Sequence, residues 1–516
     1  MVSVYNVGAL GDIRDIPPHL LPPEAWSFGR NMQMVDGYCR RSKGYSATLL
    51  DSAITPGFVM AVPGAVDNFW LWTSLTAAYG YDGVTEGDIT RLAGAYTAQN
   101  YRDWNGCILG GVPVINNGQD VPQYWPNLSI ATDLANLTNW PATLRAKVVR
   151  NFGAFLVAIN LNDNSTLLPQ AIQWSHPAEP GTLPSSWDYT DPAVDAGRIQ
   201  LTDAEGGDLL DGYLLGDYLV LYKQRSCHLL RFVGGVDILA SNLLFGIGLL
   251  APRCAAPIDA GRRHFCVGEG EVYIHSGTKE VMFPLQMKDK RYLFSDIDTT
   301  NFLNAFAFDI PEQEEVWFAY PSQGQEYPDK ALVYNYRTGV PYFRDFAGIS
   351  HSRGFVPATD ESWDSSSGVW DDDLVSWNIP VPISSVVADP IGDSFWKLND
   401  GYTFGTLTEA YLQREELSVI GRDRTGGPKA DFAKRKLITR VWPKVRGDVT
   451  LSVRVWFKEH FGQDTVWTTP KSFEPEDLYV DFEASGRLAA VEFKSLNAAD
   501  WTLEGYDVEI VEIAGY

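Results

Sequence analysis

Cysteine is scarce in this 516-residue chain, and the five that occur form no C-x-x-C pair: Cys39, Cys107, Cys227, Cys254 and Cys266. The odd number and the spacing predict buried free thiols rather than a disulfide framework or a structural zinc site. Long apolar runs are also lacking, since the longest, at residues 243–251, holds two glycines and is too short to span a bilayer. Charges interrupt the N-terminal stretch where a signal peptide needs an unbroken apolar segment. We therefore expect a chain made and folded in a reducing cytoplasm, with no membrane segment.

Positive charge is in deficit as well. The chain has 41 Lys and Arg against 65 Asp and Glu, which gives a net charge of −24 and a sequence pI near 4.7. A protein that wraps nucleic acid needs clustered cations to neutralise phosphates, so this balance argues against that class. It is compatible with a protein past which DNA slides without binding.

Catalytic signatures are absent. The sequence has no phosphate-binding G-x-x-x-x-G-K-[ST], no G-x-G-x-x-G opening a helix, no H-E-x-x-H and no G-x-S-x-G. None of the seven histidines lies at metal-ligand spacing from another. His264 and Cys266 point the same way on one predicted strand, where they could share a ligand, although simple packing beside a turn is favoured. We predict no enzyme, no cofactor and no metal.

Strands and turns are abundant. Short apolar runs bounded by Gly, Pro, Asn and Asp predict an all-β chain. The strongest strand cores begin 43, 43, 63, 54 and 44 residues apart, and a further unit lies at 393–407; the cores are residues 69–72, 112–115, 155–159, 218–222, 272–274 and 316–319. Spacing in the forties favours a β-propeller of about six four-stranded blades, which we predict over an array of β-sandwiches with coincidental spacing.

The composition changes along the chain define three parts. Residues 1–50 form an N-terminal hairpin segment around an Asp36-Gly37 turn of type I′. Residues 51–413 form the propeller, with insertions at 160–207 and 357–382 that are long enough to be working loops or partner contacts. Residues 414–516 form a basic linker and an antiparallel β-sandwich, since Val449, Leu451, Val453 and Val455 alternate with polar residues.

Two charged segments are candidate sites. The acidic run Asp371, Asp372 and Asp373 has oxygen ligands for a hard cation, but a solvated loop is the favoured interpretation. Residues 421–447 carry nine cations and two anions, a local charge of +7. This stretch is either a phosphate-contacting loop or, as we favour, a docking patch for an acidic neighbour such as another copy of the chain. The candidate docking residues are Arg422, Arg424, Lys434, Arg435 and Lys436.

Both ends of the chain resemble the tail nozzle proteins of short-tailed bacteriophages, the group that includes the packaged-DNA stabilisation proteins. At the N-terminal end the matching pattern is Pro-Pro-x-x-Trp, Gly-x-Asn, then Asp-Gly and a basic residue before a final glycine. The matching residues are Pro22, Pro23, Trp26, Gly29, Asn31, Asp36, Gly37, Arg40 and Gly44, followed near the C-terminus by Arg440, Pro443, Gly447, Trp501 and Gly505. These are structural signatures rather than catalytic ones.

The resemblance implies a virion component in the phage tail. It would form a ring of six subunits below the portal and adaptor rings, retain the packaged genome, dock tail fibres or spikes, and let DNA pass without specific binding. Carboxylates around the exit channel would repel phosphate, and we expect the loop carrying Asp371–Asp373 or the 160–207 insertion to supply part of the channel or its gate.

Two other function classes fit the sequence less well. A propeller glycosidase or lyase could stack a surface polysaccharide on Trp363, Trp370 and Trp377 of one loop. A monomeric propeller scaffold unrelated to viruses would never join a ring.

Overall fold

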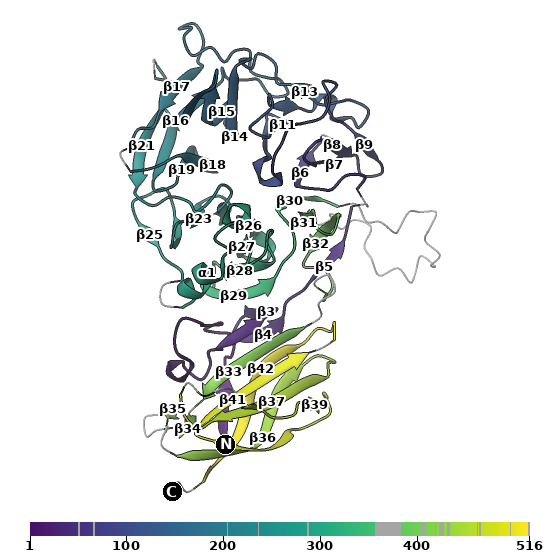
Figure 1. The fold of residues 1–516 in the computed structure, drawn as a ribbon, viewed down its shortest axis with the longest axis vertical. Helices are drawn as coiled ribbons and strands as arrows, with labels where there is room; N and C mark the ends of the chain where they lie inside the picture. The colour runs from purple at the N-terminus through teal and green to yellow at the C-terminus, as the bar shows by residue number, and fades with distance from the viewer. Residues whose placement is uncertain are drawn as a thin grey trace, which may run out of the picture.

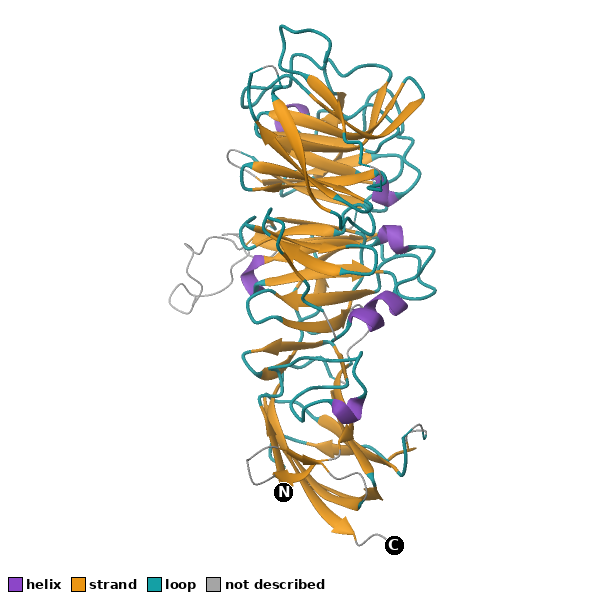
Figure 2. Cartoon of the chain, turned by 90° about the vertical axis from the view of Figure 1, so that its left-hand side faces the viewer, coloured by secondary structure: helices purple, strands orange, loops and turns teal. Residues whose placement is uncertain are grey.

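The computed structural model describes residues 1–516 except 50–51, 65–67, 204, 236, 286–287, 357–382, 404–408, 418, 423–427, 431–433, 462, 464–465, 496 and 514–516. The chain forms two all-β bodies stacked along the long axis of the molecule, a β-propeller and a β-sandwich, and both termini lie at the sandwich end (Figures 1 and 2). The predicted fold class is confirmed.

The propeller is a ring of seven antiparallel sheets, or blades, of four strands each (Figure 1). Blades 1 and 2 hold β6 (Phe58–Pro63), β7 (Asn68–Thr73), β8 (Ala78–Tyr81) and β9 (Glu86–Asp88), then β10 (Asn105–Leu109), β11 (Val112–Asn116), β12 (Gln123–Tyr124) and β13 (Ala135–Asn136). Blades 3 and 4 hold β14 (Leu144–Phe152), β15 (Phe155–Asp163), β16 (Thr166–Trp174) and β17 (Gly197–Gln200), then β18 (Leu209–Leu215), β19 (Tyr218–Lys223), β20 (Cys227–Phe232) and β21 (Leu239–Phe245).

Blades 5 and 6 hold β22 (Ala255–Ile258), β23 (Arg263–Val267), β24 (Val272–His275) and β25 (Val281–Met282), then β26 (Phe306–Ile310), β27 (Glu315–Tyr320), β28 (Lys330–Asn335) and β29 (Val340–Asp345). Blade 7 holds β30 (Ser350–Phe355), β31 (Ile383–Asp389), β32 (Ser394–Leu398) and β5 (Tyr45–Ala47). The described helices are α1 (Lys290–Asp296) and five short 3₁₀ turns at Pro18–Leu20, Tyr101–Asp103, Pro126–Leu128, Phe302–Asn304 and Pro311–Gln313.

The ring closes through a strand from the N-terminal segment. β5 pairs with β32 as the outermost strand of blade 7, although more than 300 residues separate them in sequence. On the inner side, Ser350 and Ser352 of blade 7 accept the backbone N–H groups of Val59 and Ala61 of blade 1 at 3.2 and 2.9 Å. These bonds fix the last blade to the first.

The β-sandwich has two six-stranded sheets. One contains β1 (Val2–Tyr5), β3 (Met32–Val35), β4 (Tyr38–Arg41), β36 (Arg435–Arg446), β40 (Val480–Gly486) and β42 (Thr502–Ile513). The other contains β2 (Phe28–Arg30), β33 (Ala410–Leu417), β37 (Leu451–Lys458), β38 (Val466–Trp467), β39 (Lys471–Phe473) and β41 (Leu488–Ser495). β34 (Val419–Arg422) and β35 (Pro428–Ala430) form a separate two-stranded hairpin. Val449, Leu451, Val453 and Val455 are all buried, as their alternation predicted.

Three details differ from the sequence-based expectation. The described residues form seven blades rather than about six, because the outer strand of blade 7 comes from the distant N-terminal segment. Much of 160–207 is blade 3 rather than an insertion, since residues 164–165 turn β15 into β16; the connecting loop is 175–196. Residues 1–50 are not a separate unit, because β1 to β4 belong to the sandwich and β5 to the propeller.

The 357–382 insertion lies outside the described residues. In the part of the chain that the structure describes, no helix has the length and apolarity that a membrane-crossing segment needs.

Candidate functional site

The residues of the N-terminal motif lie in the sandwich, and Asn31 reaches from there to the propeller. β3 and β4 pair around Asp36 and Gly37, whose φ angles of 50° and 84° are those of the predicted type I′ turn. Asn31, also left-handed at φ 56°, lies between β2 and β3 and is fully buried. Its side chain donates to Asp345 of blade 6 at 2.7 Å and to the Glu409 carbonyl at 2.9 Å. One side chain thus connects three distant segments.

Two tryptophans of the motif anchor the sandwich core. The Trp26 ring is 1% exposed, packs edge-on against Phe493, and donates from Nε1 to the Val7 carbonyl at 2.7 Å. Trp501 is equally buried and donates from Nε1 to the Ser495 hydroxyl at 2.9 Å. Both indole N–H groups therefore have partners, as a buried tryptophan requires.

The glycine and proline residues of the motif lie where two backbone segments of the protein approach closely. A Cβ atom on Gly505 of β42 would lie 2.6 Å from the Val4 carbonyl of β1, so only glycine allows these strands to pair. Gly29 donates its backbone N–H to the buried Asp12 carboxylate at 3.1 Å. Pro443 lies opposite Tyr506 in the β36–β42 pairing. The motif is structural in each of these places.

Sequence reasoning missed a second set of joint residues, Asp12, Arg14 and Asp289. Arg14 pairs with buried Asp12 at 2.6 Å, and its guanidinium lies 3.9 Å from the Phe28 ring centre and 4.3 Å from that of Tyr292. Its backbone N–H donates to Asp289 at 2.9 Å. Burial and the nearby Asp12 charge raise the pKa of Asp289. Asp12 and Arg14 lie in an unremarkable D-I-R sequence, far from Asp289, so no local pattern marks the set.

The predicted docking patch divides in the structure. Lys434 and Arg435 are exposed, and each pairs with a carboxylate of the same chain, Glu512 at 2.6 Å and Glu459 at 2.7 Å. The prediction that Lys436 belongs to an exposed docking patch is wrong, because Lys436 is fully buried and its ammonium donates to the Arg487 carbonyl at 2.8 Å. The reason is that β36 is an inner strand whose alternate side chains point inward.

The other predicted site residues are not placed. Arg422 ends β34, with no side chain described. Arg424, the acidic run Asp371–Asp373 and the tryptophans of that loop lie outside the described residues.

His264 and Cys266 do point the same way, and they meet a tyrosine hydroxyl. Tyr222 Oη lies 2.7 Å from His264 Nδ1, 2.8 Å from His275 Nε2 and 3.4 Å from Cys266 Sγ. Burial lowers the pKa of His264 to about 4 and that of His275 to about 3. Among the described residues no group of three His, Cys, Asp or Glu side chains is arranged to hold a metal ion.

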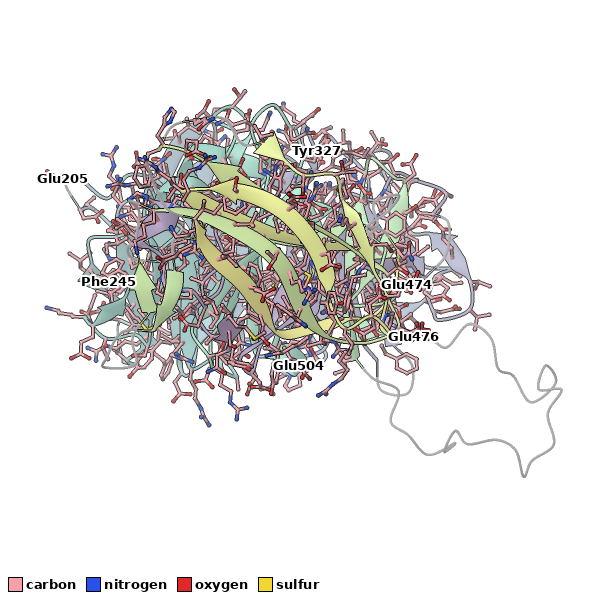
Figure 3. All side chains as sticks on the ribbon, turned by 90° about the horizontal axis from the view of Figure 1, so that it is seen from below. Glu205, Phe245, Tyr327, Glu474, Glu476 and Glu504 are labelled. Atoms are coloured by element: carbon pink, nitrogen blue, oxygen red, sulfur yellow. The ribbon has the colours of Figure 1, made fainter. Side chains whose placement is uncertain are left out.

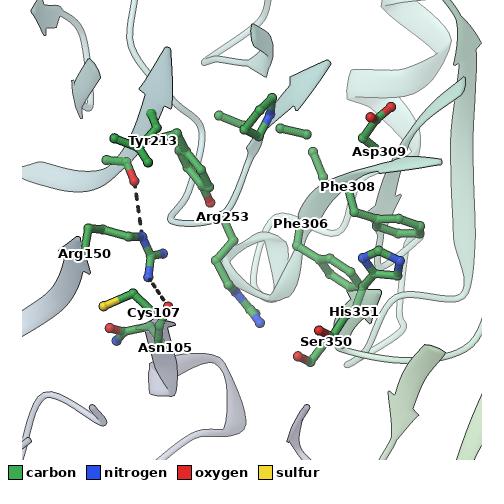
Figure 4. Close-up of a pocket in the computed structure, with 18 of the residues that line it drawn as sticks. Asn105, Cys107, Arg150, Tyr213, Arg253, Phe306, Phe308, Asp309, Ser350 and His351 are labelled. Carbon is green, nitrogen blue, oxygen red and sulfur yellow. Dashed lines mark hydrogen bonds between the residues drawn. The ribbon is translucent and has the colours of Figure 1, made fainter. Parts of the chain in front are cut away.

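A cavity of about 590 Å³ lies on the propeller axis, lined by the innermost strand of every blade (Figure 4). Its polar wall includes Arg150, which pairs with the buried carboxylate of Asp211 at 2.8 Å, and Arg353, which pairs with Glu312. Phe306 and Phe308 form an aromatic wall, with Phe308 stacked on His351 at 4.1 Å between ring centres. The volume is that of a small-molecule pocket.

Burial shifts the titration of two groups in this cavity. It raises the pKa of Asp309 to about 7, with Arg353 opposing, and it lowers that of His351 to about 3. The imidazole of His351 is therefore neutral at neutral pH, while the Asp309 carboxyl gains and loses its proton near neutral pH.

An all-β chain of a seven-bladed propeller joined to a β-sandwich is the class that the fold defines. No family model and no curated protein matches the sequence. Solved structures similar to this chain include PorZ, a bacterial surface component of the type-IX secretion system of Porphyromonas gingivalis, at 9% identity and a TM-score of 0.34 over 72% of this chain. This chain spans 43% of the length of PorZ. A functionally unknown protein from Desulfotomaculum acetoxidans matches at 10% identity and a TM-score of 0.32, over 58% of this chain and 89% of that one.

Proposed function

We propose that this chain is a structural subunit of a bacteriophage tail nozzle, the ring below the portal and adaptor rings through which packaged DNA leaves. The observation that carries the proposal is that motif residues from both chain ends build one β-sandwich, which Asn31 joins to the propeller. Trp26 comes from the N-terminal end and Trp501 and Gly505 come from the C-terminal end, and these three hold the sandwich together. Asn31 then joins the sandwich to blade 6 of the propeller. A wall segment of a conduit needs such a stiff connection between its parts.

Charge supports a passage that rejects DNA. The chain carries −24, and seen from the sandwich end Glu474, Glu476 and Glu504 lie at the periphery (Figure 3). Carboxylates on a channel wall repel phosphates, so a polyanion passes without being trapped. Retention of the packaged genome would then depend on shape rather than on affinity.

Assembly into a ring needs a heterologous interface, in which two different surfaces of the subunit meet. The exposed Lys434 and Arg435 at one end of the sandwich suit an acidic surface of the next copy. Their pairs with Glu512 and Glu459 are solvent-exposed and therefore exchange readily for a neighbour's carboxylates. We propose a homo-oligomer of six, docked on the adaptor protein and carrying fibres or spikes.

Electron microscopy of the virus particle, or of the purified chain mixed with the adaptor ring, tests the proposal. We expect density for the chain around the axial passage and no turnover of polysaccharide by the isolated protein. A Lys434→Glu, Arg435→Glu double variant should assemble less well, whereas Arg337→Glu, an exposed arginine on the propeller paired with Glu314, should not. A lone 57.3 kDa species under every condition, or a passage ringed with Lys and Arg, contradicts the proposal.

A further inference from the structure

The outermost strand of blade 4, β21, is an open sheet edge. It has seven residues, whereas β5, β9, β13, β17 and β25, the outer strands of five other blades, have two to four. β21 pairs with β20 on one side, and no backbone hydrogen bond joins it to any other part of the chain that the structure describes. It lies at the rim of the propeller (Figure 1), so its outer N–H and C=O groups can pair with another strand.

Two other long outer strands of the protein are covered or charged. β29 of blade 6 has six residues, all buried, and β2 and β3 of the sandwich lie against it. β40 of the sandwich has seven residues and carries the exposed Asp481 and Glu483, and charges of this kind keep a second strand from pairing with an open edge. β21 has neither protection, and its bulge, between Leu243 and Phe245, leaves residues 239–243 regularly paired.

The side chains of β21 favour contact with another apolar strand. Its sequence, Leu-Ala-Ser-Asn-Leu-Leu-Phe, has no charged residue and no proline. Leu243 is 54% exposed, and Phe232 at the end of the neighbouring strand β20 is 62% exposed. Seen from the sandwich end, Phe245 lies at the periphery of the molecule (Figure 3). Backbone pairing to such an edge supplies affinity, and these side chains supply apolar area beside it.

We propose that β21 pairs antiparallel with β21 of a second copy of this chain, about a two-fold axis at Asn242, the midpoint of the strand. This register pairs the whole strand with its copy and puts the exposed Leu243 opposite Ser241 of the partner subunit, a large side chain against a small one. Charge indicates that the occupant is a second copy bound at this strand. Because the chain carries −24, most of its surface repels another copy, whereas an uncharged strand does not.

The two-fold pair points its two copies in opposite directions. It is therefore a dimer of the free chain, and a ring of equally oriented subunits would have to form without it. This inference does not depend on the proposed nozzle function, because the two contacts lie on different bodies: β21 belongs to the propeller, whereas Lys434 and Arg435 belong to the sandwich end.

Sedimentation equilibrium of the full chain at about 1–100 µM tests the proposal. We expect the mean mass to rise with concentration from 57.3 kDa toward twice that value. Asn242→Lys should weaken the dimer at least about tenfold, because it puts two like charges opposite each other at the axis. The matched control is Leu167→Lys, since Leu167 of β16 is 73% exposed and the change adds the same charge; this variant should dimerise as the wild type does.

Asn242→Cys tests the register, and because Asn242 is exposed its variants should fold. Cα atoms paired across an antiparallel axis lie about 5 Å apart, within reach of a disulfide, so mild oxidation should link two chains. Leu167→Cys should stay unlinked under the same conditions.

Three outcomes would overturn the proposal. The first is a 57.3 kDa species at every concentration of the wild-type chain, and the second is a dimer that Asn242→Lys leaves unchanged or in which Asn242→Cys stays unlinked. The third is direct assembly into a ring of six in which Asn242→Lys changes nothing, and this outcome would at the same time support the nozzle function.

Discussion

Asn31 and Asp345 hold each other through two hydrogen bonds across the joint. Asn31 donates from Nδ2 to the Asp345 carboxylate at 2.7 Å, and its Oδ1 accepts the Asp345 backbone N–H at 2.9 Å. Asn31 belongs to the sandwich and Asp345 to blade 6, so two residues that are 314 positions apart in sequence connect the two bodies. Arg30 reinforces it, 3.0 Å from the same carboxylate.

We predict that Asn31→Ala lowers the free energy of unfolding by about 2–4 kcal/mol, because it removes a hydrogen bond to the Asp345 carboxylate, leaves the buried Asp345 N–H unpaired and places alanine at positive φ. Urea unfolding measures this loss. Asn164→Ala is the matched control, since Asn164 is exposed with a φ of 51°, and it should cost only the backbone part, about 1 kcal/mol. Equal losses in the two variants would mean that the Asp345 pairing contributes nothing.

The strand cores were predictable because burial on both faces leaves a local signal. Five of the six predicted cores lie in the second strand of successive blades, and 272–274 lies in β24, the third strand of blade 5. Their apolar side chains sit between neighbouring blades, where alternation with polar residues disappears. The unit at 393–407 begins one residue before β32, the third strand of blade 7.

The seventh blade and the joint were not predictable in the same way. β5 is three residues long and finds its partner β32 only through the closed ring, a relation that no local pattern encodes. The candidate docking residue Lys436 shares its basic context with Lys434 and Arg435, and only the position of β36 inside a sheet separates it from them. Arg253, which lines the axial cavity, gives no sequence signal, since hydrogen bonds to the distant residues Asp211, Ala307 and Ile349 hold it there.

The Tyr222 cluster makes stability depend on pH. His275 Nδ1 accepts the Gly277 N–H at 3.2 Å, so its proton lies on Nε2 and is donated to Tyr222, whose hydroxyl then donates to His264. Both imidazoles are neutral in this arrangement. Because burial lowers the pKa of His275 to about 3, the unfolded chain binds the proton first as the pH falls below its ordinary value of about 6.5.

We predict that uptake of a proton by His275 on unfolding lowers the free energy of unfolding by about 3 kcal/mol between neutral pH and pH 4. The free energy of unfolding of His275→Asn should therefore fall less steeply between neutral pH and pH 4 than that of the wild type. His460 is exposed, and His460→Asn should keep the wild-type slope. Parallel curves for wild type and His275→Asn would show that this imidazole is not held neutral.

Gly505 tests the close approach of β1 to β42. We predict that Gly505→Ala costs about 1–3 kcal/mol, because the new methyl group would meet the Val4 carbonyl and push β1 from its partner. Thermal melting gives the loss, and faster hydrogen exchange of the β1 amides would locate it. Gly246→Ala is the control, since nothing lies within 4 Å of its added Cβ, and it should change stability by less than about 0.5 kcal/mol. A wild-type exchange pattern in β1 would contradict the expected displacement.

Arg14 tests whether the joint depends on charge pairing inside a largely apolar layer. Its partner Asp12 is fully buried, so Arg14→Met would leave a carboxylate without its cation and should cost about 3–5 kcal/mol. Arg14→Lys keeps the charge but loses the bidentate contact with Asp12 and the stacking on Phe28 and Tyr292. Its free energy of unfolding should therefore lie between those of the wild type and Arg14→Met. Urea unfolding ranks the three proteins.

The control for Arg14 is the exposed pair of Arg40 and Asp500, which are 43% and 46% exposed and 2.8 Å apart. Arg40→Met should cost no more than about 1 kcal/mol, because water screens an exposed pair. If Arg14→Met were as mild as Arg40→Met, Asp12 would have to take up a proton in the folded chain. The loss of unfolding free energy in Arg14→Met would then grow as the pH rises, because a protonated Asp12 becomes harder to maintain. If the joint does not need the pair, the loss should instead stay the same at every pH, so a pH series on Arg14→Met separates the two cases.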